Sequence, residues 1–413
     1  MTPGNVTAFL LENSMAKKII VAIIIICILP GLSGCEHSGT IYSNYREVEQ
    51  LQLIRAVGVD SDGGKVRLTI SSGEPVEGGQ CMLLSRSAES IATAANSLQD
   101  YAAGQELYYA HTEYFLLGQR AAENGIGQYL DYIERSTTLP MGISIFLVRG
   151  GTAEGLITGS GDGQYDTGQS LASLKRVVER RGDNHVFSCA DTARALSENG
   201  AALICALRPS KLDGSVFTSE VEAETTAVPD GFGILKDGAL VGFVDQDEAL
   251  CAVILIQNGM SALVLSDADG GHVALTLEGS KAKILPVWNP DGSLERVDVD
   301  VELRARLVEL SQYHDVADKG LLDLLGGILA REMDRRFTNL LSLENQYKAD
   351  FLGIGNMLRD ADARRFDAMP RPWDELLGDV DFRVNVSARV DQTSDLTGSV
   401  SVDGEGEFGD SGQ

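Results

Sequence analysis

The chain has 413 residues, of which 44% are hydrophobic and 23% are charged, values typical of a soluble globular protein. The length predicts two domains or three, and the composition excludes both a disordered chain and a polytopic membrane protein. Asp and Glu number 60 against 34 Lys and Arg, a net charge of −26, which repels nucleic-acid phosphates and anionic lipid headgroups. We therefore expect no nucleic-acid partner, and any membrane association must come from an apolar or covalent device.

The N-terminal segment from Met15 has the features of a secretory signal. Lys17 and Lys18 precede an unbroken apolar run over residues 19–29. A helix of this length spans roughly 16 Å, about half of a bilayer core, so it is too short to be a transmembrane helix. A positive start before a short apolar run is typical of a signal peptide, which we predict over residues 15–34.

The end of this segment indicates a lipoprotein. Leu32, Ser33 and Gly34 precede Cys35, which resembles the lipobox of bacterial lipoproteins. In a lipobox the cysteine thiol carries a diacylglycerol before the signal is cleaved. We predict a mature chain that begins at a lipidated Cys35 on the extracytoplasmic face, with a polar tether over residues 35–45 and no other cofactor. The alternative is an ordinary secretory signal with a chance cysteine.

The remaining cysteines give no metal-binding pattern. Cys27 would leave with the signal, and four cysteines are scattered through the mature chain: Cys81, Cys189, Cys205 and Cys251. Export permits disulfides, and four cysteines allow three pairings, which the sequence leaves open. Because they lie in apolar segments, buried free thiols are the favoured interpretation.

Residues 46–209 alternate between strand and helix patterns, and we predict them as an N-terminal domain. The sequence predicts strands at 51–59, 66–70, 107–117, 142–148 and 201–207, helices at 85–103, 119–134, 170–180 and 190–198, and a glycine-rich loop at 150–168.

A polar, acidic stretch at 210–229 is predicted as a linker, and residues 230–393 as a C-terminal domain. The predicted elements there are a hairpin that turns at Lys236–Gly238, a helix at 245–256, strands at 273–278 and 297–304, a helix at 321–341 and a strand at 380–390. The acidic tail at 394–413 is expected to be disordered. The predicted class is α+β, with mostly antiparallel sheets packed against helices.

No catalytic or metal-binding motif is complete. His111–Glu113 matches half of a zinc deaminase signature, whose Pro-Cys-x-x-Cys part is absent. Asp60–Gly63 and Asp267–Gly270 begin like calcium loops but lack the later acidic ligand, so hairpin turns are favoured. The carboxylates at 298, 300 and 302 alternate as on a solvated sheet face. We expect no catalytic residue, no metal and no enzymatic activity.

The order of several short strings is similar to the Ger(x)C family, the lipoprotein C subunits of bacterial spore germinant receptors. The resemblance covers nearly all of the mature chain. The strings are Arg46–Glu49, Leu53-Ile54, Ala56–Asp60, His111–Leu117, Gly125-Ile126, Leu130–Arg135, Gly231–Asp237, Leu240–Gly242, Tyr347, Asp350–Gly355 and Trp373, followed by the alternating strand from Val380 to Val390. One departure is Glu36-His37, where the family commonly has Trp-Asp after the lipidated cysteine.

The resemblance implies a non-enzymatic subunit on the outer face of the spore inner membrane, held by lipid on Cys35. It also implies assembly with membrane-embedded A and B subunits, and no small-molecule substrate is assigned. Tyr108, Tyr109 and Trp373 are candidate interface residues, with core packing as the alternative for each. A solute-binding lipoprotein of a transporter is the rival interpretation, and a cell-envelope hydrolase is a third.

Overall fold

The structure is a computed structural model that describes residues 50–72, 81–102, 104–159, 167–211, 225–257, 263–268, 271–310 and 319–391. The predicted signal peptide, lipobox, Cys35, tether and acidic tail lie outside these residues. The chain divides into two compact units, residues 1–51 and 52–413. Apart from residues 50 and 51, the described residues all belong to the second unit.

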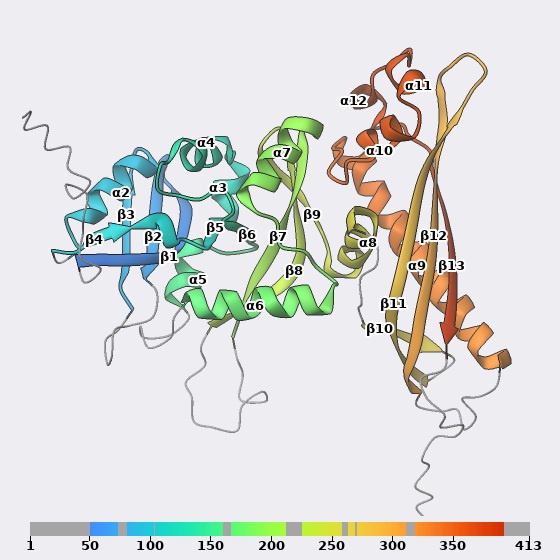
Figure 1. The fold of residues 1–413 in the computed structure, drawn as a ribbon, viewed down its shortest axis with the longest axis horizontal. Coiled ribbons are helices and arrows are strands. Elements are labelled where there is room, and N and C mark those ends of the chain that lie inside the picture. The colour runs from blue at the N-terminus through green and yellow to red at the C-terminus, as the bar shows by residue number, and fades with distance from the viewer. Residues whose placement is uncertain are drawn as a thin grey trace, which may run out of the picture. The chain divides into compact units, whose positions relative to one another are not determined.

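The first sheet has a parallel centre and antiparallel flanks (Figure 1). Its strands are β1 (Leu51–Asp62), β2 (Lys65–Ser72), β3 (Leu83–Ala88), β4 (Glu106–Tyr108), β5 (Tyr114–Gly118), β6 (Ser144–Val148), β7 (Ala201–Lys211), β8 (Thr225–Lys236) and β9 (Ala239–Val244). The order is β3-β2-β1-β5-β6-β7-β8-β9, and β4 pairs with β1. Neighbours among β1, β5, β6 and β7 are parallel.

Helices cover both faces of this sheet, which explains why its central strands are continuous apolar runs. The helices are α2 (Ile91–Gln99), α3 (Gln119–Glu123), α4 (Gly127–Arg135), α5 (Ala153–Thr158), α6 (Thr167–Arg181) and α7 (Cys189–Asn199). α2, α3, α4 and α7 lie on one face and α5 and α6 on the other (Figure 1). The strand pleat divides side chains accordingly, so Phe115 and Tyr114 belong to different apolar clusters.

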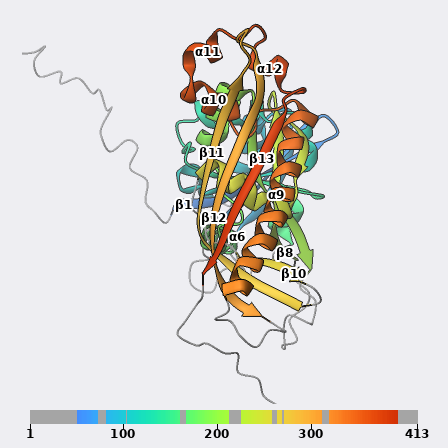
Figure 2. The same cartoon turned by 90° about the vertical axis from the view of Figure 1, so that its right-hand side faces the viewer.

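The second sheet is formed by β10 (Leu263–Ala268), β11 (Gly271–Trp288), β12 (Leu294–Leu310) and β13 (Phe382–Asp391), in that order. β13 runs parallel to β12, and the other pairs are antiparallel. Helix α9 (Lys319–Tyr347) runs along this sheet (Figure 2). Val297, Val299 and Val301 alternate with polar residues and share a core with Met333 and Phe337 of α9.

Helix α8 (Gln246–Gln257) joins the two sheets into one core. Residues 249–255 are all buried, and a helix that is apolar all round is stable only when other elements surround it. It packs against β8, α9 and β11. One apolar cluster therefore extends from Phe146 of the first sheet through Leu250 to Val299 of the second.

The last short helices follow α9 and precede β13. They are α10 (Ile354–Ala361), α11 (Ala363–Asp367) and α12 (Trp373–Leu376). They lie together near one end of the second sheet (Figure 1), and α10 packs against β11.

The α+β class is confirmed, with six antiparallel and four parallel strand pairs among those whose register the described residues give. Several predicted elements were wrong in detail. The helix expected at 119–134 is two helices, α3 and α4, separated by residues 124–126. The helix expected at 85–103 begins only at Ile91, because β3 extends to Ala88 and Ser90 caps the helix. The strand expected at 107–117 is interrupted by a 3₁₀ turn, η2 (Tyr109–His111). The loop expected at 150–168 contains α5, capped by Thr152.

The predicted linker at 210–229 lies partly within a hairpin. β7 pairs with β8 from Ala201–Lys236 through Lys211–Thr225, and residues 212–224 lie outside the described part of the chain. β8 and β9 therefore belong to the first sheet, although most of their residues lie after the predicted linker.

Cleavage of the chain at a protease site placed between residues 212 and 224 is expected to leave two fragments that remain bound. The β7–β8 ladder and the shared apolar cluster hold them together without the peptide link. Size-exclusion chromatography in native buffer should give one peak containing both fragments, and guanidinium should separate them. Separation in native buffer would contradict a shared core.

Candidate functional site

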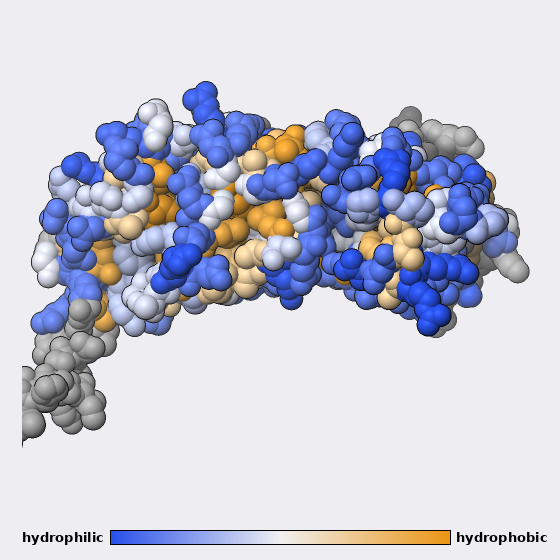
Figure 3. Space-filling view, turned by 90° about the horizontal axis from the view of Figure 1, so that it is seen from above, coloured by the Kyte–Doolittle hydropathy of each residue, from blue (hydrophilic) through white to orange (hydrophobic). Residues whose placement is uncertain are grey.

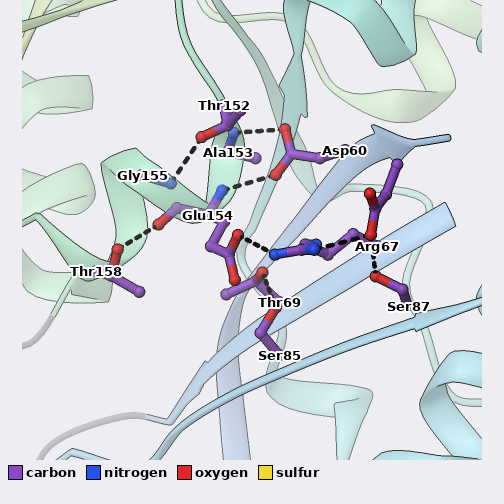
Figure 4. A network of polar contacts seen from close by, with 11 residues as sticks. Asp60, Arg67, Thr69, Ser85, Ser87, Thr152, Ala153, Glu154, Gly155 and Thr158 are labelled. Atoms are coloured by element: carbon purple, nitrogen blue, oxygen red, sulfur yellow. Dashed lines mark hydrogen bonds and ion pairs between the residues drawn. The ribbon is translucent and has the colours of Figure 1, made fainter.

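A buried carboxylate, Asp60, ties the end of β1 to helix α5 (Figure 4). Its two oxygens accept hydrogen bonds from the backbone N–H groups of Ala153 and Glu154, each at 2.8 Å. These are first-turn donors that have no partner inside the helix. Burial raises the pKa of Asp60, and the two backbone bonds and Arg67 only partly offset that effect. The bond joins residues 93 positions apart, so it fixes tertiary structure.

Two glycines make this approach possible. A Cβ on Gly118 of β5 would overlap the Oδ1 atom of Asp60, and a Cβ on Gly58 would lie 2.9 Å from the Cβ of Ala153. Both positions therefore exclude any side chain. The string Ala56–Asp60, which contributed to the family resemblance, is explained by this close packing of strand and helix.

Arg67 extends the network to the edge of the sheet. Its guanidinium donates to Glu154 Oε2 and to Asp62 Oδ2, both at 2.8 Å, and Ser87 donates to the same Asp62 oxygen at 2.6 Å. The bonds from Ser87 and Arg67 lower the pKa of Asp62. All of these groups bond to one another, so the network is a structural tie and offers no free catalytic group.

A second buried carboxylate, Asp350, holds the turn between α9 and α10. It accepts bonds from the N–H groups of Ile354 at 2.6 Å and Gly355 at 2.9 Å, and from the indole Nε1 of Trp373 at 2.8 Å. A Cβ on Gly355 would lie 2.6 Å from the Trp373 ring. Burial raises the pKa of Asp350, and these bonds oppose the rise.

Glu344, near the end of α9, is fully buried beside this turn. Its Oε1 accepts from the N–H of Leu352 at 2.9 Å, whereas its Oε2 has no hydrogen-bond partner among the described residues. Burial and then the charge of Asp350 raise the pKa of Glu344 well above its usual range. A buried carboxyl group that has neither a cation nor enough hydrogen-bond donors favours its neutral form.

A pocket of about 720 Å³ lies against this turn. One side is formed by the end of α7 and by the β8–β9 turn, including Asn199, Lys236 and Asp237. The other side is formed by the segment from Lys348 to Leu377, including Trp373. Asn356 Nδ2 donates to Asn199 Oδ1 at 2.7 Å, and Lys236 Nζ donates to the Tyr347 carbonyl at 3.2 Å. These bonds join the first sheet to the α9–α10 turn.

Side chains of both charges and two aromatic rings line the pocket. The acidic ones are Glu198, Asp237, Asp350, Asp367 and Asp374, and the basic ones are Lys236, Lys348 and Arg359. Phe366 and Trp373 supply the rings, with centroids 6.4 Å apart. Such a combination of aromatic rings and charged groups can bind another molecule.

The structure places the three candidate interface residues in two regions. Tyr108 and Tyr109 lie at β4 and η2, where Tyr108 is half-buried beside His111. The Tyr109 ring packs against the second apolar cluster, its hydroxyl is buried, and burial raises its pKa. Trp373, the first residue of α12, is half-buried and lines the pocket, whereas neither tyrosine does.

Cys81, Cys189, Cys205 and Cys251 are buried and free of disulfides. Burial raises the pKa of Cys189 and of Cys205 to about 12, so both thiols are unreactive at neutral pH. Among the described residues, no group of three His, Cys, Asp or Glu side chains could hold a metal ion. No helix in the described part of the chain is long and apolar enough to cross a membrane.

Two family models match the chain. The one described as the spore germination protein N-terminal domain matches residues 44–209, and the one described as spore germination B3/GerAC like, C-terminal, matches residues 230–394. Together they cover most of the sequence. The chain belongs to the Ger(x)C family of spore germination proteins.

Two relatives agree with this family. Spore germination protein KC of Bacillus subtilis (strain 168) is 21% identical over 398 residues, which is 87% of this chain and 92% of that protein. The crystal structure of the GerBC protein matches with a TM-score of 0.50 at 19% identity, over 81% of this chain and 96% of that one. The structural match shows a shared fold.

Sequence reasoning missed Glu344 and the partner of Asp60. The buried position of Glu344 follows from the apolar stripe of α9, in which it falls three residues after Leu341. That spacing was a usable signal, because an acidic residue on a core stripe is unusual. No local signal links Asp60 to α5, because that helix is short and follows a glycine pair.

Replacing Asp60 with Asn is expected to lower the free energy of unfolding by about 1–3 kcal/mol, because an amide offers one acceptor oxygen to two backbone donors. Urea unfolding at pH 7 measures it. The matched control is Asp131→Asn, whose carboxylate forms an exposed pair with Arg135 on α4, and it should change stability little. Equal effects of the two substitutions would refute the role of Asp60.

Gly355→Ala is expected to destabilise the chain by about 1–3 kcal/mol, since the new methyl group collides with Trp373 and Asp350. The control is Gly127→Ala at the start of α4, where nothing lies within 4 Å of the added carbon. There alanine should stabilise by up to about 1 kcal/mol. Thermal unfolding compares the two, and a neutral Gly355→Ala would show that the turn is not tightly packed.

Proposed function

We propose that this chain is the lipid-anchored C subunit of a spore germinant receptor. The single observation that carries the proposal is the match of both Ger(x)C domains across most of the chain. In this role it assembles with membrane-embedded A and B subunits and helps to trigger germination in response to nutrients. It acts through contacts with those subunits and not as an enzyme.

The lipobox supports membrane attachment through Cys35. Leu32, Ser33 and Gly34 precede this cysteine, and the apolar run before them is too short to span a bilayer. A single acyl chain gives only marginal membrane binding, so a diacylglycerol with further acylation provides the stable anchor. The chain then lies on the outer face of the spore inner membrane.

The pocket beside Trp373 is the surface best suited to a contact with a partner. It combines an aromatic wall with charged groups of both signs, and aromatic anchors carry much of the energy in protein interfaces. Tyr108 is a second, separate candidate because its ring is half-exposed. Hydrophilic residues cover much of the surface seen from the side of α4 and α7, with apolar residues between them (Figure 3).

Spores that carry Cys35→Ala are expected to lose or weaken their response to nutrients while still germinating with a trigger that bypasses nutrient receptors. The variant chain should also fail to incorporate labelled palmitate. The matched control is Cys27→Ala, which removes a cysteine that leaves with the signal peptide, and it should respond normally and be lipidated.

Deletion of the whole gene separates the remaining outcomes. A normal response in Cys35→Ala with a defect in the deletion would keep the receptor role and remove the need for lipid. A deletion without any germination defect, in a strain that lacks other copies of the family, would contradict the proposal and favour a solute-binding lipoprotein.

A further inference from the structure

The α9–α10 corner, residues 344–355, contains two buried carboxyl groups and no bonded cation. Glu344 is 0% exposed and Asp350 is 3% exposed. Asp350 is surrounded by backbone and indole N–H donors. At Glu344 the N–H of Leu352 donates to Oε1, whereas Oε2 has no hydrogen-bond partner among the described residues. The hydrogen bonds of the corner therefore stabilise a negative charge on Asp350 better than one on Glu344.

Most charged side chains on the neighbouring elements are bonded elsewhere. Those bonds are Lys236 to the Tyr347 carbonyl, Arg359 to Asp367, Asn339 to Glu248 of α8, and Arg383 and Arg389 of β13 to Asp381 and Asp391. Other charged residues that line the pocket are Glu198, Asp237, Lys348 and Asp374. Asp350 is therefore the charged group that acts directly on Glu344.

The backbone of the corner reverses direction through two left-handed residues. Lys348 has a φ of 50°, a left-handed conformation that is unfavourable for a lysine, and Gly353 has a φ of 72°. The turn between them contacts the pocket through Asp350, Gly355 and Trp373. A change in the turn would therefore move the Trp373 ring, which lines the pocket.

We propose that Glu344 and Asp350 form a proton-operated latch on the pocket. With a proton on the Glu344 carboxyl group, the corner is closed and Trp373 stays bonded to Asp350. When that proton passes to water, the buried corner holds two negative charges that repel each other, and it loosens to admit water. The Trp373 ring then shifts and becomes more accessible to solvent. The latch acts within this chain alone, so it stands or falls separately from assembly into a receptor.

The direction of the effect on stability follows from the raised pKa of Glu344. The folded chain holds this proton more tightly than the unfolded chain, so folding is most stable below the ordinary glutamate pKa. This stability is lost as the pH rises toward the pKa of the folded state. Glu344→Gln keeps the Oε1 acceptor for Leu352 and removes the titration.

The test uses the fluorescence of Trp373 in the full chain purified in detergent. Trp288→Phe leaves Trp373 as the only tryptophan. Acrylamide quenching of its emission, measured from pH 5 to pH 9, is expected to rise through one transition above the ordinary glutamate pKa. Glu344→Gln in the same background should abolish the transition and keep the low quenching throughout.

The matched control is Glu332→Gln on the same helix. Arg335 and Arg336 bond to Glu332 and lower its pKa to about 2, outside the range of the titration, so this variant should keep the transition. Persistence of the transition in Glu344→Gln, or its absence in the parent chain, would overturn the latch. If Glu344→Gln does not fold, Glu344→Met supplies a non-titrating side chain of similar volume.

Discussion

The burial of α8 is the constraint on which the rest of the structure depends. A helix with seven consecutive buried residues, 249–255, must be surrounded, and β8, α9 and β11 surround it. The two sheets therefore cannot be separated without exposing this helix to water. Within the first sheet, the β7–β8 ladder holds β8, one of the elements that pack against α8, in place. The pocket and the α9–α10 corner lie where these two halves meet, so both depend on the shared core.

Buried carboxylates organise two distant turns in the same way. Asp60 and Asp350 each accept a pair of backbone N–H groups at the start of a helix, α5 and α10. In each case a glycine, Gly118 or Gly355, leaves the space that the carboxylate needs. These groups are satisfied and structural. Glu344 differs because half of its carboxyl group has no partner, which is why the proton matters there and not at Asp60.

The sequence pattern predicted turns and helices correctly where neighbouring residues determine the structure. The Lys236–Gly238 turn has positive φ at Asp237 and Gly238, as a tight hairpin between right-twisted strands requires. The apolar stripe at 321–341 likewise became α9. The pairing of strands that lie far apart in the sequence could not be predicted from such a pattern. Alternation showed that Phe382–Asp391 is a strand, but its parallel pairing with β12 depends on a connection through α9 to α12.

The candidate site shows the same limit. Trp373 could be singled out as an exposed aromatic candidate, but its bond to Asp350 and its place beside Asn199 come from tertiary packing. The sequence did not predict that the first sheet extends through β9, because the polar stretch at 210–229 has the composition of a linker between domains. The family resemblance located the strings, and the structure shows that several of them converge on the pocket.

Hydrogen exchange in increasing denaturant tests the shared core most directly. Amides in β6 of the first sheet and β12 of the second should lose protection with the same free energy and the same denaturant dependence, because α8 couples them into one cooperative unit. Loss of protection in one sheet while the other stays fully protected would show two independent cores and contradict this account.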